Sequence, residues 1–312
     1  MNLEEQHPNV YIILVNYGNW KDTANCLQSI ESCYNGLSII IVDVCNLYHS
    51  FRFLLELTTN LSHNRYKIVE QKENMGFAAA CNLGLKTITE KHPDSFIWIL
   101  NNDTTINTET IPNLIRCFKN NLENRTAFIG SLILDYSDRN LIQYAGGYID
   151  KKWAIIKVLK EGENLSKVNL PEEVTTDWVM GASMFFHSSI INEIGFMPED
   201  YFLYYEDIEW SLQAIRKGYN NIVSTKSHVY HKQGSSTGLK YSTGQSFNPI
   251  SAKYYYSNYL KFFARNFPIK LNTARFMLIK KILRQFLSLN FRHSAIILEA
   301  LVNQLKSHGT RD

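Results

Sequence analysis

The sequence feature that most constrains the fold is an alternation of short apolar runs with stretches of helical periodicity over the first hundred residues. Strands are predicted over residues 10–15, 37–42, 66–69 and 96–100, and helices from Asp22 as N-cap, over 51–61 and between 74 and 90. Apolar strands that alternate with amphipathic helices form a parallel sheet covered on both faces. The pattern therefore predicts an α/β fold with a doubly wound, mostly parallel sheet.

Beyond residue 125 the pattern is less regular, with strands predicted over 128–134 and 154–159 and another ending at Tyr230. Helices are predicted over 188–194, ended by Gly195, and over 204–217, with Gly218 as the stop. We expect one domain over residues 1–250, divided into halves at about 125, and a helical region over 251–312.

Polar residues follow the predicted strands directly, where a doubly wound sheet binds its ligands. They are Asn16 and Tyr17, Asp43, Asn74 with Gly76, and Asn101 to Asp103. We expect these groups to line one ligand site.

Composition excludes several classes of protein. The longest apolar runs are far shorter than the roughly 20 residues of a spanning helix, and the acidic N-terminus lacks the features of a signal peptide. The five cysteines include no CxxC pair, so neither a disulfide framework nor a zinc knuckle is indicated. The body of the chain contains no basic patch with interleaved aromatic residues, so the sequence does not indicate nucleic-acid binding. A cytoplasmic protein is the expectation.

The net charge of +3 conceals an asymmetry. From residue 261 onward there are ten Lys and Arg against two acids, which is +8 and leaves −5 for the first 260 residues. The tail has helical spacing, with an apolar face of Ile279, Ile282, Leu283, Phe286 and Leu287 and a basic face of Lys280, Lys281 and Arg284 with Gln285. Two interpretations are open: a helix packed on the body, or an interfacial helix that holds the protein peripherally on the anionic inner face of a membrane.

Asp103 ends a buried strand and is placed to bind a divalent cation, although an Asn-Asn-Asp turn equally forms a cap. One carboxylate needs a partner, and His231 is the candidate, although a lone histidine is more often structural.

The carboxylates Glu206 and Asp207 follow a strongly aromatic stretch over 201–205. Apolar walls raise the pKa of a carboxylate toward that of a useful general base. The alternative is that these acids only complement a helix dipole.

The turn that contains Asn74 and Gly76, followed by Asn82 and Gly84, would let a phosphate or ribose approach the backbone. It is neither GxGxxG nor a Walker loop, and no nucleophile elbow is present.

These motifs, in this order, resemble the family 2 glycosyltransferases of GT-A fold, in particular their bacterial rhamnosyltransferase-like branch. The segments that carry the resemblance are 12–18, 39–43, 74–78 with Asn82, 100–104, 178–184, 202–207 followed by Gly218, and 230–232 with Ser235 and Ser236. The resemblance covers residues 10–236, with a weaker similarity to residue 263.

The resemblance implies an inverting transferase that uses a nucleoside-diphosphate sugar, dTDP-rhamnose or a UDP-hexose, and Mn²⁺ or Mg²⁺. Its implied site residues are Asn16, Tyr17, Asp43, Asn74, Gly76, Asn82, Asn102 and Asp103 for the nucleotide, Asp103 and His231 for the metal, Trp178, Gly181 and Ala182 for the acceptor, Asp207 as base and Glu206 as its orienting neighbour. The implied acceptor is a glycan or a lipid-linked oligosaccharide of O-antigen or capsule assembly. A nucleotidyltransferase and a non-catalytic glycan-binding or scaffold relative remain as alternatives.

Overall fold

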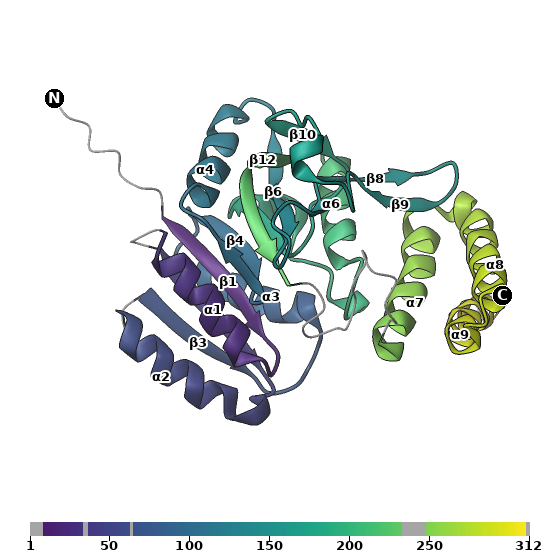
Figure 1. Ribbon diagram of the computed structural model, residues 1–312, viewed down its shortest axis with the longest axis horizontal. Helices are drawn as coiled ribbons and strands as arrows, with labels where there is room; N and C mark the ends of the chain where they lie inside the picture. The colour runs from purple at the N-terminus through teal and green to yellow at the C-terminus, as the bar shows by residue number, and fades with distance from the viewer. Residues whose placement is uncertain (1–8, 34–36, 63–64, 233–247, 310–312) are drawn as a thin grey trace.

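The computed structural model describes residues 9–33, 37–62, 65–232 and 248–309 (Figure 1). Ser235 and Ser236 of the sequence motif therefore lie outside the described residues.

The first four strands are parallel and form one side of the sheet. They are β1 (Val10–Asn16), β2 (Ser38–Val44), β3 (Tyr66–Gln71) and β4 (Phe96–Asn101). Strand β1 pairs with both β2 and β4, and the register sets Asn16 beside Asp43 and Val15 beside Asn101. This register brings three of the predicted polar strand ends to one edge of the sheet.

The second half of the chain continues the same sheet. Its strands are β5 (Thr104–Ile106), β6 (Thr126–Asp135), β7 (Ile142–Tyr144), β10 (Glu173–Thr176), β11 (Ser183–His187) and β12 (Asn220–His231). In the described part of the chain the sheet has ten strands, with the order β10-β12-β6-β11-β4-β1-β2-β3 and with β5 on β12 and β7 on β6. The sheet is mixed because β11 runs antiparallel to β4 and β6. The prediction of a mostly parallel α/β sheet is confirmed.

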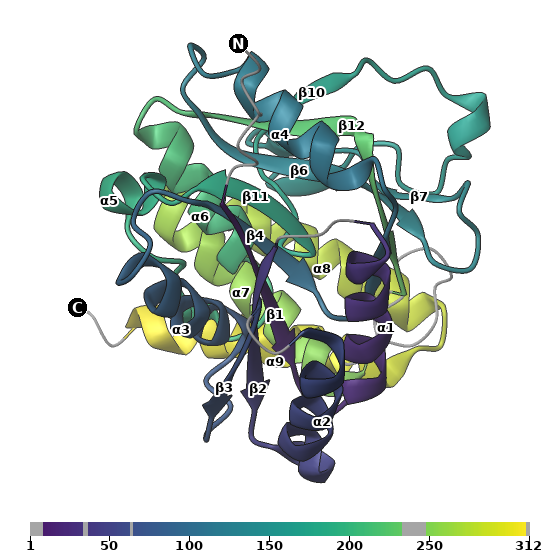
Figure 2. The ribbon, with the colours of Figure 1, turned by 90° about the vertical axis from the view of Figure 1, so that its left-hand side faces the viewer.

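Two helical layers cover the sheet because successive strand residues point to opposite faces. Ile12 packs on the layer that contains α1 (Trp20–Glu31), α2 (Ser50–Ser62) and α4 (Thr110–Asn120). Ile13 packs on the layer that contains α3 (Phe77–Thr89), α5 (Ile190–Ile194) and α6 (Glu206–Arg216). Figure 2 shows α1 and α2 on one side of β1 and α3 on the other.

The remaining elements connect these layers. They are a hairpin of β8 (Gly147–Asp150) and β9 (Ile155–Val158) and the 3₁₀ turns Leu47–His49, Leu165–Lys167, Glu199–Tyr201 and Pro268–Lys270.

Two predicted helix starts are wrong. Helix α1 begins at Trp20 with Asn19 as N-cap, and Asp22 lies in its buried first turn, where it pairs with Lys232. Helix α6 begins at Glu206 instead of 204, because Tyr204 and Tyr205 have positive φ angles of 69° and 77°. Side chains rarely adopt that conformation, so the stop before Glu206 depends on tertiary contacts.

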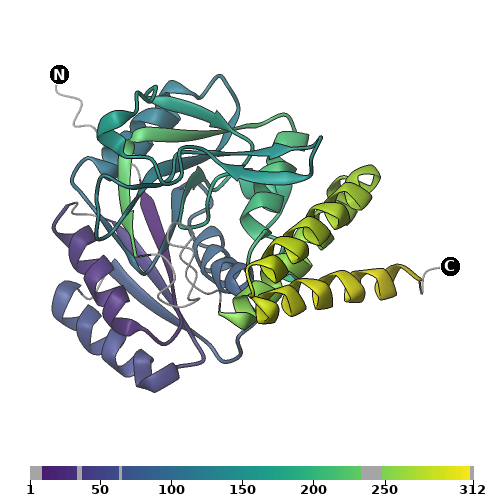
Figure 3. The ribbon, with the colours of Figure 1, turned by 45° about the vertical axis from the view of Figure 1, so that its right-hand side comes forward.

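Three helices follow the sheet domain: α7 (Pro249–Asn266), α8 (Leu271–Leu287) and α9 (Phe291–Gly309). Figures 1 and 3 show them together at the side of the molecule away from α1 and α2. Leu271, Ala274 and Leu278 of α8 are buried in a core shared with α7 and α9. The predicted apolar face of α8 is not the packed one: Ile282 is half-buried, whereas Ile279, Leu283, Phe286 and Leu287 are exposed. Among the helices described, none has the length and apolarity to cross a membrane.

Candidate active site

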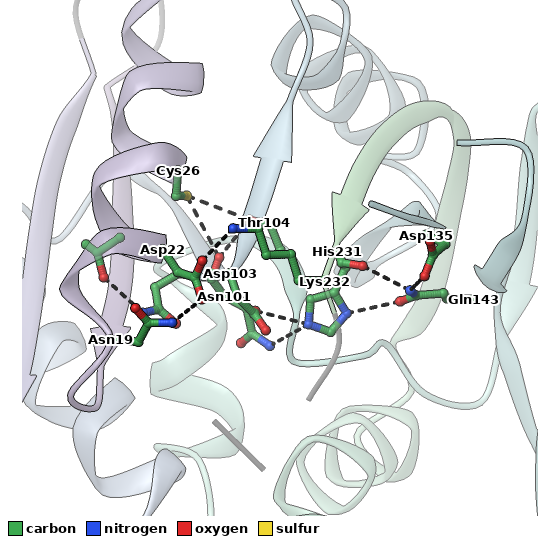
Figure 4. A network of polar contacts seen from close by, with 12 residues as sticks. Asn19, Asp22, Cys26, Asn101, Asp103, Thr104, Asp135, Gln143, His231 and Lys232 are labelled. Atoms are coloured by element: carbon green, nitrogen blue, oxygen red, sulfur yellow. Dashed lines mark hydrogen bonds and ion pairs between the residues drawn. The ribbon is translucent and has the colours of Figure 1, made fainter. Parts of the chain in front are cut away.

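Asp103 and His231 meet at the carboxyl edge of the sheet, as the sequence predicted (Figure 4). Asp103 follows β4, His231 ends β12, and His231 Nε2 lies 3.1 Å from Asp103 Oδ1. Strand β12 reaches this point through its antiparallel pairing with β5, which sets His231 opposite Thr104. Both side chains are nearly buried.

Gln143 fixes the tautomer of His231. Gln143 Nε2 donates to Asp135 Oδ2 and to the His231 carbonyl, so its Oε1 accepts from His231 Nδ1 at 3.2 Å. Nε2 is then the ring nitrogen that faces the Asp103 carboxylate, and Asn101 Nδ2 lies 3.4 Å from it. An imidazole nitrogen and a carboxylate oxygen are both ordinary ligands of a divalent cation, and two ligands of one cation with bonds of about 2.1 Å are typically about 3 Å apart. The pair therefore fits a divalent cation. In the described residues no third His, Cys, Asp or Glu joins it, so further ligands would come from water or substrate.

Lys232 extends from β12 to α1 across the same edge. Its Nζ forms an ion pair with Asp22 Oδ1, and Asp22 also accepts from Asn19 Nδ2 (Figure 4). Burial lowers the pKa of Lys232, but the bond to Asp22 outweighs this effect and the pKa is raised overall. Sequence reasoning missed this cation, although its place next to His231 was a signal.

A second polar network joins the ends of β1, β2 and β4. Asn16 Nδ2 donates to Asp43 Oδ1 at 2.6 Å, and Thr23 Oγ1 donates to Asn16 Oδ1 at 2.8 Å. Asn102 Nδ2 donates to Thr23 Oγ1, and Ser50 Oγ donates to both Asp43 oxygens. Burial raises the pKa of Asp43, and the hydrogen bonds from Asn16 and Ser50 oppose this rise. The network orders three predicted nucleotide residues, Asn16, Asp43 and Asn102; Thr23 and Ser50 were missed.

The predicted turn residues have mixed outcomes. Tyr17 is exposed beside this network, and Asn74 is exposed and caps its own turn by accepting from the Gly76 amide. Gly76 has a φ of +94°, and a Cβ there would lie 2.3 Å from the carbonyl oxygen of Phe202. The space that Gly76 leaves is thus filled by protein. Asn82 is also engaged within the protein, with Met197 and Glu199, which favours a structural role over the predicted nucleotide contact.

Glu206 and Asp207 begin α6 and have unequal surroundings. Asp207 is half-buried and accepts from two backbone amides, that of Gly181 at 2.9 Å and that of Ile208 at 2.8 Å. Glu206 is buried, and its Oε2 has no hydrogen-bond partner among the residues that the structure describes. Burial and the charge of Asp207 raise the pKa of Glu206 to about 8; burial also raises the pKa of Asp207, while its backbone amides oppose the rise. Glu206 is therefore the member that keeps a proton, and Asp207 is the accessible anion.

The predicted acceptor segment connects the two carboxylate sites. The Gly181 amide binds Asp207, and the next carbonyl, that of Ala182, accepts from the Asn101 amide before Asp103. Trp178 is buried against Tyr144, and its ring fills the place of the missing Cβ of Gly147. Its indole N–H finds no hydrogen-bond acceptor in the described part of the chain.

Helix α7 supports the aromatic loop before Glu206. Asn258 Nδ2 donates to the backbone carbonyls of Tyr201, Leu203 and Tyr204, and the Phe77 amide donates to the Phe202 carbonyl. Sequence reasoning gave Asn258 no role in the site, and nothing in local periodicity marks it.

The model of the family described as "Glycosyl transferase family 2" matches residues 11–185, more than half of the chain. The chain belongs to glycosyl transferase family 2. The match spans β1 to β11 and so includes Asp103 and the acceptor segment.

One curated relative is the low-salt glycan biosynthesis hexosyltransferase Agl10 of Haloferax volcanii, 26% identical over 212 residues. The match covers 67% of this chain and 62% of the relative, so the chain spans less than two thirds of that protein's length.

Several solved structures share the fold of this chain, which is the GT-A fold. GalNAc-T7 with UDP, GalNAc and Mn²⁺ matches with a TM-score of 0.61 and 16% identity, over 85% of this chain and 51% of that one. The mannosyltransferase PcManGT of Pyrobaculum calidifontis, in complex with GDP-Man and Mn²⁺, matches with a TM-score of 0.57 and 14% identity, over 96% and 88%. TarS residues 1–349 of S. aureus match with a TM-score of 0.53 and 12% identity, over 93% and 90%.

Proposed function

We propose that this chain is an inverting glycosyltransferase that moves a sugar from a nucleoside-diphosphate sugar to a hydroxyl group of a glycan or a lipid-linked acceptor. The observation that carries the proposal is the link, through residues 181–182, between the carboxylate pair Glu206–Asp207 and the Asp103–His231 pair. Such a link sets a base and a diphosphate site at the two ends of one short segment.

Asp207 is the general base. It takes the proton of the acceptor hydroxyl as the hydroxyl oxygen forms a bond to the anomeric carbon. The bond from that carbon to the diphosphate breaks on the opposite face, and its electron pair leaves with the nucleoside diphosphate. General-base assistance of this kind typically contributes about 10²–10⁴-fold. Protonated Glu206 keeps the negative charge of the pair on Asp207.

Asp103 and His231 would hold Mn²⁺ or Mg²⁺, which when bound supplies positive charge to the leaving diphosphate. The network of Asn16, Asp43 and Asn102 would bind the nucleoside with Tyr17, and Asn74 would lie at its edge. Trp178, Gly181 and Ala182 would shape the acceptor side. Lys232 adds a cation beside the same leaving group.

We place the chain in the cytoplasm and in surface polysaccharide assembly, such as O-antigen or capsule. The donor is a UDP-hexose or dTDP-rhamnose, as in the rhamnosyltransferase-like branch. A hexose is supported by the hexosyltransferase relative. The proposed domain division is a GT-A domain over 1–250 and a helical region over 251–312.

The test is release of nucleoside diphosphate from a panel of sugar nucleotides with Mn²⁺, Mg²⁺ or EDTA. We expect metal-dependent hydrolysis of one donor, which Asp207→Asn abolishes without loss of nucleotide binding. The matched control is Asp94→Asn, because Asp94 is exposed on the surface beside His187. Nucleotide binding without turnover by the wild type, with acceptor present, would favour a non-catalytic relative.

A further inference from the structure

Helices α8 and α9 each carry a second apolar stripe that no described residue covers. On α8 it is Phe276, Ile279, Leu283 and Leu287, and on α9 it is Phe291, Leu298, Val302 and Leu305. The spacings of three, four and seven residues put each set on one side of its helix. Both helices pack through other residues, such as Leu278 and Ile297, which are buried in the shared core. The exposed stripes are therefore additional to the faces that hold the helices together.

The two stripes meet where α8 turns into α9. The rings of Phe286 and Phe291 contact each other edge to face, with centroids 5.1 Å apart. Leu287 and Leu289 beside them are 82% and 75% exposed. We call the two stripes with this corner the hairpin surface. Single exposed apolar residues are ordinary, but a set of them gathered on two adjoining helices is typical of an interaction site.

The charges around the hairpin surface are almost all positive. Residues 270–306 contain seven Lys and Arg and one acid, Glu299, which forms an ion pair with Lys253 of α7 at 2.7 Å. Lys280 and Arg284 are both exposed. Lys280 lies one helical turn after Phe276, and Arg284 lies one turn after Lys280, so both charges lie along the edge of the α8 stripe. A partner must therefore offer an apolar region that can take up these side chains, with negative charge beside it.

We propose that the hairpin surface docks on an anionic lipid bilayer. The Phe, Leu and Ile side chains would enter the boundary between head groups and acyl chains, and the Lys and Arg side chains would lie among the lipid phosphates. A second copy of this chain fits less well, because two such surfaces would bring their positive charges together. Helices α8 and α9 stand at the outer side of the molecule, away from α1 and α2 (Figure 3).

Docking would also orient the active site. Helix α7 packs against α9 on one side and, through Asn258, holds the loop before Glu206 on the other. A lipid-linked acceptor would then enter from the membrane side. Binding to vesicles needs neither donor nor acceptor, so this proposal stands or fails separately from glycosyl transfer.

The experiment is sedimentation of the full chain with vesicles of phosphatidylcholine alone or of an equimolar mixture with phosphatidylglycerol. We expect binding to the anionic vesicles only, weakened by high salt. Leu287→Gln should lower the partition coefficient about tenfold, since one leucine leaves the bilayer. Leu122→Gln, the same change at an exposed leucine outside α8 and α9, should leave it unchanged.

The charge contribution has its own pair of variants. Lys280→Gln should lower the partition coefficient about fivefold, and Lys119→Gln at the exposed end of α4 should leave it unchanged.

Leu287 is exposed, so its variant should melt at the wild-type temperature. Equal binding to both kinds of vesicle, no binding to either, or unchanged binding of Leu287→Gln would overturn the proposal. So would a dimer in sedimentation velocity that Leu287→Gln dissociates, which would identify a second copy as the occupant.

Discussion

Replacing Glu206 by Gln should change how the stability of the protein depends on pH. Burial and the neighbouring Asp207 raise the pKa of Glu206 from 4.5 to about 8. In this interval the folded protein holds a proton at Glu206 that the unfolded chain has released. The free energy of unfolding therefore falls as pH rises from about 5 to 8. Below the unfolded pKa the folded and unfolded states both hold the proton, so this group causes no change of stability with pH there.

The size of the effect follows from one proton. A difference of one bound proton changes the free energy of unfolding by about 1.4 kcal/mol per pH unit. Over about three pH units the wild type should lose about 4 kcal/mol from this group, a large part of the 5–15 kcal/mol typical of a domain. Gln has no proton to release, so Glu206→Gln should lose that part of the slope, whatever its stability at a single pH.

The assay is urea unfolding at four or more pH values between 5 and 8, without nucleotide and with EDTA. Glu163→Gln is the control, because it makes the same change at an exposed glutamate that faces Lys160. The control should follow the wild-type slope. Parallel curves for wild type and Glu206→Gln would refute the reasoning, because they would mean that Glu206 ionises normally in the folded protein.

Three further predictions concern the supports of the site. Gly76→Ala should lower the free energy of unfolding by about 2 kcal/mol or more in a urea titration, because its Cβ would lie 2.3 Å from the carbonyl oxygen of Phe202 at a φ of +94°. Asn258→Ala should cost about 1–3 kcal/mol and lower kcat, since three carbonyls before Glu206 lose their donor; an unchanged kcat would separate this loop from catalysis. Gln143→Leu should raise the Mn²⁺ concentration for half-maximal turnover about 10–100-fold, since the His231 ring loses its orienting partner, and an unchanged value would contradict the metal assignment.

Most of the fold could be predicted from local pattern. The apolar run over 10–15 became β1, and the run over 37–42 became the core of β2, because short β-branched segments between helices can bury both faces only inside a sheet. The polar residues at the strand ends also needed no tertiary information, since parallel strands deliver their carboxyl ends to one edge. The order of the motifs was enough to indicate the family.

Local pattern failed where a residue's partner is distant in the chain. Periodicity assigned Asp22 to a cap, but its partner is Lys232, 210 residues away, and α1 begins two residues earlier. The nucleotide contact of Asn82 was implied by the family resemblance and stays a prediction, and the structure adds distant partners that no local pattern indicated, Met197 and Glu199. Such pairings depend on strand order and register, which no short window of sequence contains.

The sequence by itself determined the α/β class, the strand ends and the carboxylates available for chemistry. Only the tertiary structure decided which of those groups work together. It set His231 against Asp103 across 128 residues, and it buried Glu206 more deeply than Asp207 although the two are adjacent in the chain. The physical reason is that a side chain's type is local, whereas its burial, its pKa and its partners depend on everything packed around it.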